Sequence, residues 1–329
     1  MRPRHMSGQF ARRMVWVIVM LLSLPIITGS FTQAAHAQGS PGIARLVNAA
    51  GTCLQPPTNL DLATLSDSAL VQYGLLPRPR DVSQIAKWEE VIHHSLHRSC
   101  SQVATNRVAG RHNTDNWAGN VATGSGYTDI YANWHVPCVS GTTRPSYSAQ
   151  WVGLAGYTNG GNLLQIGTEQ NIDSNGGAHY DAWWEDLADP QFKNLNVINN
   201  FPVGCQDYVY ASTFVDEVYI DDYTTNSYFD KVDSSYPGGN QAADWIVERQ
   251  SANGSPLPLA NFSSYEAQFY NSTTEQNTVF KNVGSTSHDS QYMCTDSFFG
   301  LCGTGSTLLA NPTAITPDGT SFGVNWDHS

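Results

Sequence analysis

Short runs in which apolar and polar residues alternate, separated by Gly, Asn, Ser and Pro, fill the chain from Asn116 onward. This two-residue period is typical of strands with one buried face, and it constrains the fold more than any other feature. In 129–137 one face is entirely apolar and consists of Ile130, Ala132, Trp134 and Val136. In 263–271 the same pattern opposes Tyr265, Ala267 and Phe269 to Glu266 and Gln268. Helical periodicity is nearly absent here, so we expect an all-β domain of antiparallel strands.

Turn-forming residues interrupt these runs at short intervals. The Gly-rich segments 153–161 and 237–239 are therefore predicted to be loops between strands. Antiparallel sheets with one apolar face bury it most readily against a second sheet. The expected architecture is a sandwich of two antiparallel sheets, preceded by a small helical segment.

Charge divides the chain into three segments. Residues 1–37 contain four Arg and no acid, 38–111 contain seven Lys and Arg against five Asp and Glu, and 112–329 contain five Lys and Arg against 23 Asp and Glu. We expect a signal peptide at 1–37, a helical prosegment at 38–111 and the β-sandwich domain at 112–329. The acidic domain repels phosphates and anionic lipids, so we expect no nucleic-acid partner and no membrane partner.

The first segment has the form of a secretory signal peptide. Its four Arg precede the apolar run 14–27, and Ala35-His36-Ala37 supplies small residues before a cleavage site. The run is shorter than the roughly 20 residues that span a bilayer and contains Pro25, so a retained membrane anchor is the weaker alternative. We expect a secreted, extracellular protein, and Arg12-Arg13 leave the export route open.

The second segment is basic and contains one clear amphipathic helix, in which Ile85, Trp88, Ile92 and Leu96 share a stripe. A shorter helix is expected from about Leu65. A small basic piece between a signal peptide and an acidic domain fits a removable prosegment, because opposite charge would dock it on the domain at neutral pH.

The same helix contains a group that resembles a metal site, consisting of Glu90, His93, His94 and His97. His93 and His97 have i, i+4 spacing but lack the HExxH order, so the zinc motif is weak. The alternative is a pH sensor, because histidines gain charge between about pH 7 and 5 and would then loosen the segment.

All six cysteines follow the predicted cleavage site, which favours disulfides in an exported protein. Pairing within each segment gives Cys53 with Cys100, Cys138 with Cys205 and Cys294 with Cys302, although six cysteines allow other combinations.

One hydrolase motif near the carboxyl end is misleading. Residues 319–323 fit the GxSxG pattern, and Asp327 and His328 follow in the expected order. A nucleophile elbow requires a helix after the serine, and only six residues follow Gly323. We interpret the segment as a strand or a terminal tail.

Three stretches, 163–169, 180–185 and 243–248, place polar residues inside apolar strands. Alternation puts Glu248 on the face of Asp244 and Ile246. It puts Gln165 with Leu163 and Gly167, and Glu185 with Asp181 and Trp183.

These stretches, with 116–119, 134–137 and 151–153, resemble the glutamic peptidases, or eqolisins, in order and spacing over about residues 115–270. The resemblance implies a concanavalin-like jelly-roll sandwich with its site on a concave sheet face. It implies acid endopeptidase activity on polypeptides, with no cofactor, by a monomer made with an inhibitory prosegment. It identifies Gln165 and Glu248 as catalytic, Trp117 and Trp151 as cleft tryptophans, and Glu185 as a supporting cleft residue. Ala155 and Glu169 stand where the fungal pattern has Asp, and we expect Glu169 to contact substrate.

The chemistry of peptide hydrolysis is consistent with such a dyad. A carboxyl group can move protons to and from water and the leaving amine when its pKa lies near the working pH. An amide NH2 stabilises an oxyanion without titrating. Glu248 would act as general base or acid toward the attacking water, and Gln165 would hold that water and stabilise the oxyanion. No metal and no covalent intermediate are needed. Surrounding negative charge should raise the pKa of Glu248 above its usual value of about 4.3.

Two alternatives belong to other functional classes. In a glycoside hydrolase, Glu185 and Glu248 would be the carboxylate pair. In a carbohydrate-binding module, the abundant aromatic residues would form a binding platform. The composition favours work in acid, because at pH 2 to 3 the positive charges left on 112–329 are five Lys and Arg and five His, which limits self-repulsion.

Overall fold

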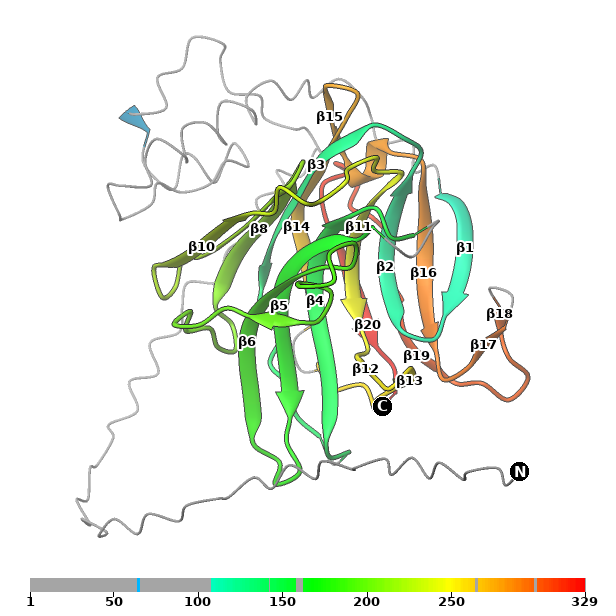
Figure 1. Ribbon diagram of the computed structural model, residues 1–329. Coiled ribbons are helices and arrows are strands. Elements are labelled where there is room, and N and C mark those ends of the chain that lie inside the picture. The colour runs from blue at the N-terminus through cyan, green and yellow to red at the C-terminus, as the bar shows by residue number, and fades with distance from the viewer. Residues whose placement is uncertain are drawn as a thin grey trace, which may run out of the picture. The chain divides into compact units, whose positions relative to one another are not determined.

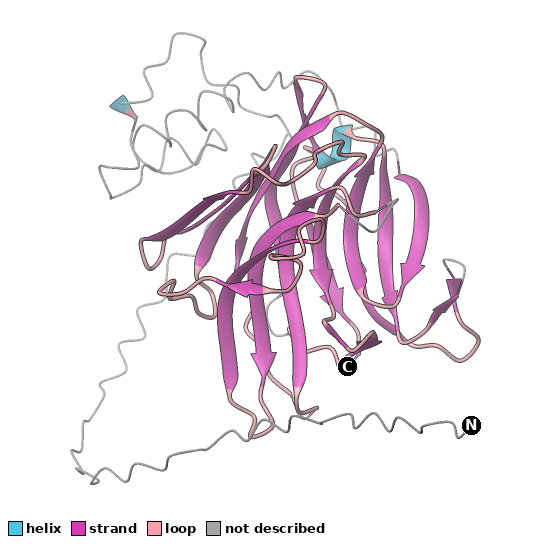
Figure 2. Cartoon of the chain, viewed as in Figure 1, coloured by secondary structure: helices cyan, strands magenta, loops and turns pink. Residues whose placement is uncertain are grey.

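The computed structural model describes residues 64–65, 108–141, 143–157, 162–263, 266–298 and 301–328. The predicted signal peptide, the prosegment helices, the group Glu90–His97 and the pair Cys53–Cys100 lie outside the described residues. Strand β1, Val108–Thr114, runs across the predicted boundary at residue 111. Among the described residues from 108 onward, regular structure is strand apart from the 3-10 turn η3, Val283–Ser285 (Figure 2).

The strands form a hydrogen-bonded path that folds into two layers (Figure 1). In path order, the first layer contains β20 (Phe322–Trp326), β19 (Leu308–Pro312), β16 (His288–Cys294), β2 (Trp117–Thr123), β11 (Ala242–Glu248), β4 (Ser146–Leu154), β5 (Leu164–Ile172), β6 (Ala178–Asp186) and β7 (Asn196–Val197). The second layer contains β10 (Ser227–Val232), β9 (Glu217–Asp222), β8 (Tyr208–Phe214), β3 (Tyr127–His135), β14 (Ala267–Gln276) and β15 (Val279–Asn282). Two small hairpins stand apart, formed by β12 (Ser251–Ala252) with β13 (Ser255–Pro256) and by β17 (Ser297–Phe298) with β18 (Leu301–Cys302).

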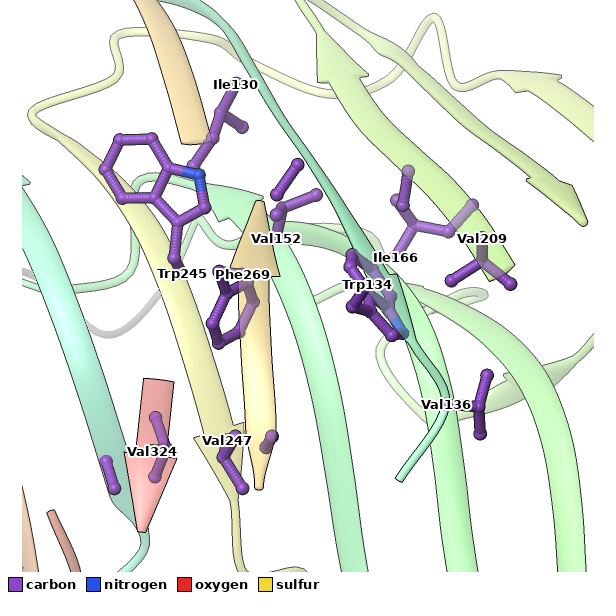
Figure 3. Close-up of a cluster of buried hydrophobic side chains, with 14 of the residues drawn as sticks. Ile130, Trp134, Val136, Val152, Ile166, Val209, Trp245, Val247, Phe269 and Val324 are labelled. Atoms are coloured by element: carbon purple, nitrogen blue, oxygen red, sulfur yellow. The ribbon is translucent and has the colours of Figure 1, made fainter. Parts of the chain in front are cut away.

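The core lies between the layers, where the apolar faces of the strands meet (Figure 3). Trp134 of β3 and Trp245 of β11 are fully buried, and each donates its indole N–H across the core. Trp134 Nε1 donates to Thr168 Oγ1 at 3.1 Å, and Trp245 Nε1 donates to the Tyr131 carbonyl oxygen at 3.1 Å. A buried indole that kept an unpaired N–H would cost stability, so these bonds fix how the layers face each other.

The antiparallel β-sandwich expected from the alternating runs is confirmed. The apolar residues predicted to share a face in 129–137 are fully buried, Ile130, Ala132 and Trp134 in β3 and Val136 just after it. The last two residues of the GxSxG segment begin β20. One pair differs from the expectation, because β1 runs parallel to β16.

Gly153 was predicted to begin a loop, and this is wrong, because β4 continues through it to Leu154. A Cβ atom at Gly153 would lie 2.9 Å from Leu163 Cδ1, so the glycine leaves space for the side chain of the residue just before β5. The predicted turn at 237–239 does lie between strands, in the β10–β11 connection.

Two of the predicted disulfides are formed, Cys138–Cys205 and Cys294–Cys302. Within the described part of the chain, no helix has the length and apolar character needed to cross a bilayer.

Candidate active site

Five adjacent strands, in the order β2-β11-β4-β5-β6, carry every residue predicted for the site. Their antiparallel register decides which side chains share a face, because directly paired residues point the same way. Glu248 pairs with Trp117 on one side and with Ala149 on the other, and Ala149 pairs with Glu169. Gln165 pairs with Glu185. Trp151 lies on the same face of β4, two residues after Ala149. The face opposite the core therefore presents all six predicted residues: Trp117, Trp151, Gln165, Glu169, Glu185 and Glu248.

A second apolar cluster covers the floor of this face. It consists of Val121, Ala149, Trp151, Leu163, Trp183, Ala242 and Ile246, with Trp117, Tyr157 and Leu187 packed against it. The rings of Trp117 and Trp151 meet edge to face, with centroids 5.2 Å apart. Gly167 lies between Trp151 and Trp183, and a Cβ atom there would lie 2.6 Å from Trp151 Cβ. The glycine of the LQIG stretch thus leaves room for the Trp151 side chain.

The Glu248 carboxyl group is half-buried at the end of β11 and faces the N–H donors of Trp151, Trp117 and Asn116. Trp151 Nε1 donates to Oε2 at 2.9 Å, and Asn116 Nδ2 donates to Oε1 at 3.0 Å. Burial raises the pKa of Glu248 to about 7, and the negative charge of Glu185 acts in the same direction. The bonds from Trp151, Trp117 and Asn116 lower this pKa, because they favour the ionised form. Glu248 is consequently protonated in acid and has N–H donors in place for its carboxylate.

The Gln165 side chain is 4% exposed and is oriented by Glu185. Its Nε2 donates to Glu185 Oε2 at 2.7 Å, while its Oε1 is buried without a hydrogen-bond partner among the described residues. Burial raises the pKa of Glu185 to about 7, and the bond from Gln165 lowers it. An amide NH2 has two hydrogens, so Gln165 keeps one N–H for another acceptor.

The two predicted catalytic residues share this face but belong to separate hydrogen-bonded groups. The described bonds join Gln165 to Glu185 and join Glu248 to Trp151 and Asn116. The groups influence each other electrostatically, because the charge of Glu185 raises the pKa of Glu248.

Glu169 lies four residues after Gln165 on β5, in register with Ala149 and Glu248, and is 7% exposed. Gln250 Nε2 donates to its Oε2, and burial raises the pKa of Glu169. The nearby charge of Asp181 acts in the same direction. Its carboxyl group is therefore already paired within the protein.

Sequence reasoning did not identify Asn116 as a site residue, although it lies in the same stretch as Trp117. The turn that holds it is fixed by Thr114, whose Oγ1 accepts from Trp117 N at 2.7 Å, and by Arg249 N, which donates to the Asn116 carbonyl oxygen at 2.8 Å. The contact between Asn116 and Glu248 spans 132 residues of sequence, so no local pattern predicts it. The one sequence feature that pointed to Asn116 is its position next to Trp117.

Asp244 is a second buried acid on this face, two residues before Ile246. It is fully buried, and neither carboxyl oxygen has a hydrogen-bond partner among the described residues. Burial raises its pKa well above the usual value, which favours the neutral acid.

Within the described residues, no three His, Cys, Asp or Glu side chains come together in a way that could hold a metal ion. What the face offers chemically is an oriented carboxamide, three tryptophans and four carboxyl groups with raised pKa values, those of Glu169, Glu185, Asp244 and Glu248.

Comparisons with known proteins identify the family and the fold. The sequence profile of the peptidase A4 family matches residues 115–296, which is more than half of the chain. Scytalido-glutamic peptidase, solved with a transition-state analogue inhibitor, has a TM-score of 0.53 at 19% identity, covering 65% of this chain and 98% of its own. SCP-B, an eqolisin solved with the tripeptide Ala-Ile-His, has a TM-score of 0.50 at 19% identity, with the same coverage of 65% and 98%. Among curated protein sequences, none matches the chain. The family profile, which extends over every strand of the candidate site, shows that this chain belongs to the peptidase A4 family, the glutamic peptidases or eqolisins.

Proposed function

We propose that this protein is a secreted acid endopeptidase that hydrolyses polypeptides with Glu248 and Gln165, through a water molecule and without a metal or a covalent intermediate. The observation that carries the proposal is the Glu248 carboxyl group, which lies on the same face as Gln165 with its pKa raised to about 7 and two N–H donors on its oxygens. Family membership supports the peptidase class.

The raised pKa of Glu248 suggests which proton moves first. In acid the carboxyl group is protonated and donates its proton to the scissile amide nitrogen. The resulting carboxylate, held by Trp151 and Asn116, takes a proton from water as the water oxygen adds to the carbonyl carbon. The free N–H of Gln165 stabilises the oxyanion. The C–N bond then breaks, the amine leaves with the donated proton, and Glu248 is again protonated.

The remaining residues of the face have supporting roles in this proposal. Glu185 orients the Gln165 amide, Trp117 and Trp151 form the cleft floor, and Glu169 contributes to a flanking substrate subsite. The enzyme acts as a monomer. The predicted prosegment, 38–111, inhibits the domain until it is removed.

The direct test is to hold the purified protein at pH 3 with acid-denatured casein and with a panel of polysaccharides. Peptide release without sugar release is expected, and it should persist in the presence of a metal chelator. Sugar release without peptide release would instead support a glycoside hydrolase, in which Glu185 and Glu248 are the carboxyl pair.

Trp151→Phe tests the hydrogen bond on Glu248. The substitution keeps an aromatic ring beside Trp117 but removes the N–H that donates to Glu248 Oε2. Because that bond lowers the pKa of Glu248, we expect the pKa to rise by about one unit, which carbon-13 NMR of the carboxyl groups would measure. We also expect kcat at pH 3 to fall by about tenfold, because the carboxylate formed after proton transfer loses a donor. Trp183→Phe is the matched control, since Trp183 lies on the same face and its Nε1 has no partner among the described residues. Equal pKa values in the two variants would contradict the assignment.

A further inference from the structure

Three carboxyl groups gather at the end of β6, on the core side of the strand that presents Glu185. Asp186 is fully buried, Asp233 is 5% exposed, and Asp189 lies near the surface. Ala188 N donates to Asp186 Oδ1 at 2.8 Å. Ser235 Oγ lies 2.5 Å from both Asp233 Oδ1 and Asp189 Oδ2, which ties these two acids together.

The other oxygen atoms of the two buried acids have no donor. Asp186 Oδ2 and Asp233 Oδ2 are shut off from solvent and accept no hydrogen bond from the described residues. Asp189 N donates to the Asp186 carbonyl oxygen at 3.3 Å, and Ser235 Oγ links Asp189 to Asp233, so the two buried carboxyl groups belong to one small cluster. The charge of Asp233 also acts on Asp186. Two adjacent buried carboxylates would repel strongly, whereas one proton between them supplies the missing donor to both.

We propose that Asp186 and Asp233 form a proton-sharing carboxyl pair that, in acid, positions the strand ends bearing Gln165 and Glu185. The positioning role rests on the function proposed above, while the shared proton does not.

The surroundings of the pair contain no compensating cation. Among the described residues no ion pair joins Asp186 or Asp233 to a basic side chain, and the nearby Lys231 lies over the Phe192 ring, 5.3 Å from its centroid. The Tyr236 hydroxyl donates elsewhere, and Asp189 adds negative charge. Burial first, and then the charges of Asp233 and Asp189, raise the pKa of Asp186 to about 6.

The pair joins two segments that hold the site. Asp186 follows Glu185 directly and pairs with Leu164, the neighbour of Gln165. Asp233 begins a turn in which Tyr236 N donates to the Asp233 carbonyl oxygen at 3.0 Å. The Tyr236 hydroxyl lies among three acceptors: Asn240 Oδ1 at 2.5 Å, the Asn162 carbonyl oxygen just before β5 at 2.9 Å, and the Leu154 carbonyl oxygen at the end of β4 at 3.3 Å. Repulsion within the pair would therefore loosen the ends of β4, β5 and β6 together.

The sign of the pH effect follows from the raised pKa of Asp186. The stabilisation is complete below about pH 4, where the acid is protonated in both the folded and unfolded states, and it is lost as the pH rises through about 6. The protonated pair thus holds the ends of β4, β5 and β6 in place in acid, and these strand ends loosen as the pair ionises near neutral pH.

Asp233→Asn tests the shared proton, because a carboxamide donates an N–H to Asp186 at every pH. The measurement is best made on a Glu248→Gln background, which prevents self-digestion. Between pH 4 and pH 7 we expect the melting temperature of the parent to fall by roughly 5 °C more than that of the Asp233→Asn variant. The melting temperature of the Asp233→Asn variant will still fall somewhat between pH 4 and pH 7, since the pKa values of Glu185, Asp221 and Asp222 are also raised. In carbon-13 spectra the pKa of Asp186 should drop from about 6 toward 4.

Asp296→Asn is the charge-matched control at an exposed acid, and it should leave both readouts unchanged. Asp186→Asn provides a second route to the same pair if Asp233→Asn folds poorly. The proposal is overturned if Asp233→Asn loses stability as steeply as its parent, or if Asp186 titrates near pH 4 in the parent. It is also overturned if added Ca²⁺ stabilises the parent at pH 7 and not the variant, since the acids would then be a cation site.

Activity measurements test the positioning role on the otherwise intact chain. At pH 3 Asp233→Asn should match the unmodified protein in kcat and KM within about twofold, and at pH 6 its kcat should be several-fold higher. Equal kcat values at pH 6 would limit the pair to a structural role. If neither protein cleaves casein at pH 3, the proposed function fails, while the stability result stands by itself.

Discussion

Glu248→Gln is expected to lower peptide release from casein at pH 3 by about 10³-fold, within the range that general acid–base catalysis contributes. A carboxamide has nearly the same shape as the carboxyl group. Its single oxygen can accept a hydrogen bond from Trp151 or Asn116, whereas its NH2 cannot accept one. It cannot give a proton to the leaving amine or take one from water. The loss should therefore appear in kcat, with KM changed little.

The fold should survive this substitution and even gain stability at neutral pH. The pKa of Glu248 is raised to about 7, so its carboxylate is disfavoured in the folded state as the pH rises toward that value. Circular dichroism and thermal melting at pH 3 and pH 7 serve as controls for folding. Undiminished peptide release by a well-folded variant would remove Glu248 from the mechanism.

Gln165→Ala is expected to lower kcat by about 10² to 10³-fold, the usual effect of removing one oxyanion donor. Since the Gln165 Nε2 also donates to Glu185 Oε2, the substitution leaves Glu185 without that partner. The bond lowers the pKa of Glu185, so this pKa should rise above about 7 in the variant.

Gln165→Glu separates the donor role from simple loss of volume. The new carboxyl group can donate only while it is protonated, so any activity it restores should be confined to low pH and disappear earlier than in the unmodified protein. A glycoside hydrolase would tolerate Gln165→Ala with nearly intact sugar release, and a carbohydrate-binding module would keep its ligand affinity in Glu248→Gln. Either result would move the protein to another functional class.

The sequence predicted which face each residue occupies better than it predicted which residues touch. Alternation placed Glu248 with Ile246 and placed Gln165 with Gly167, and both assignments agree with the strand register. Alternation is a local property of one strand, so it reports the face without identifying the neighbouring strand. The insertion of β11 between β2 and β4 is a long-range pairing with no local signal.

The contacts that sequence reasoning missed have the same cause. Asn116 and Asp233 acquire their roles only when segments distant in sequence come together, at Glu248 and at Asp186. Gly153 was assigned to a loop because glycine favours turns, whereas its position in β4 is set by the side chain of Leu163. The disulfide between Cys138 and Cys205 was predictable because the acidic segment contains few other partners for either cysteine.

The position of β11 also determines when the site can first exist during synthesis. Its neighbours β2 and β4 are synthesised long before it. The strand edges that pair with β11 have no partner until β11 inserts between them. Pairings of such high contact order form slowly and late. The sheet that would carry the proposed dyad therefore cannot be completed until residue 248 has been synthesised.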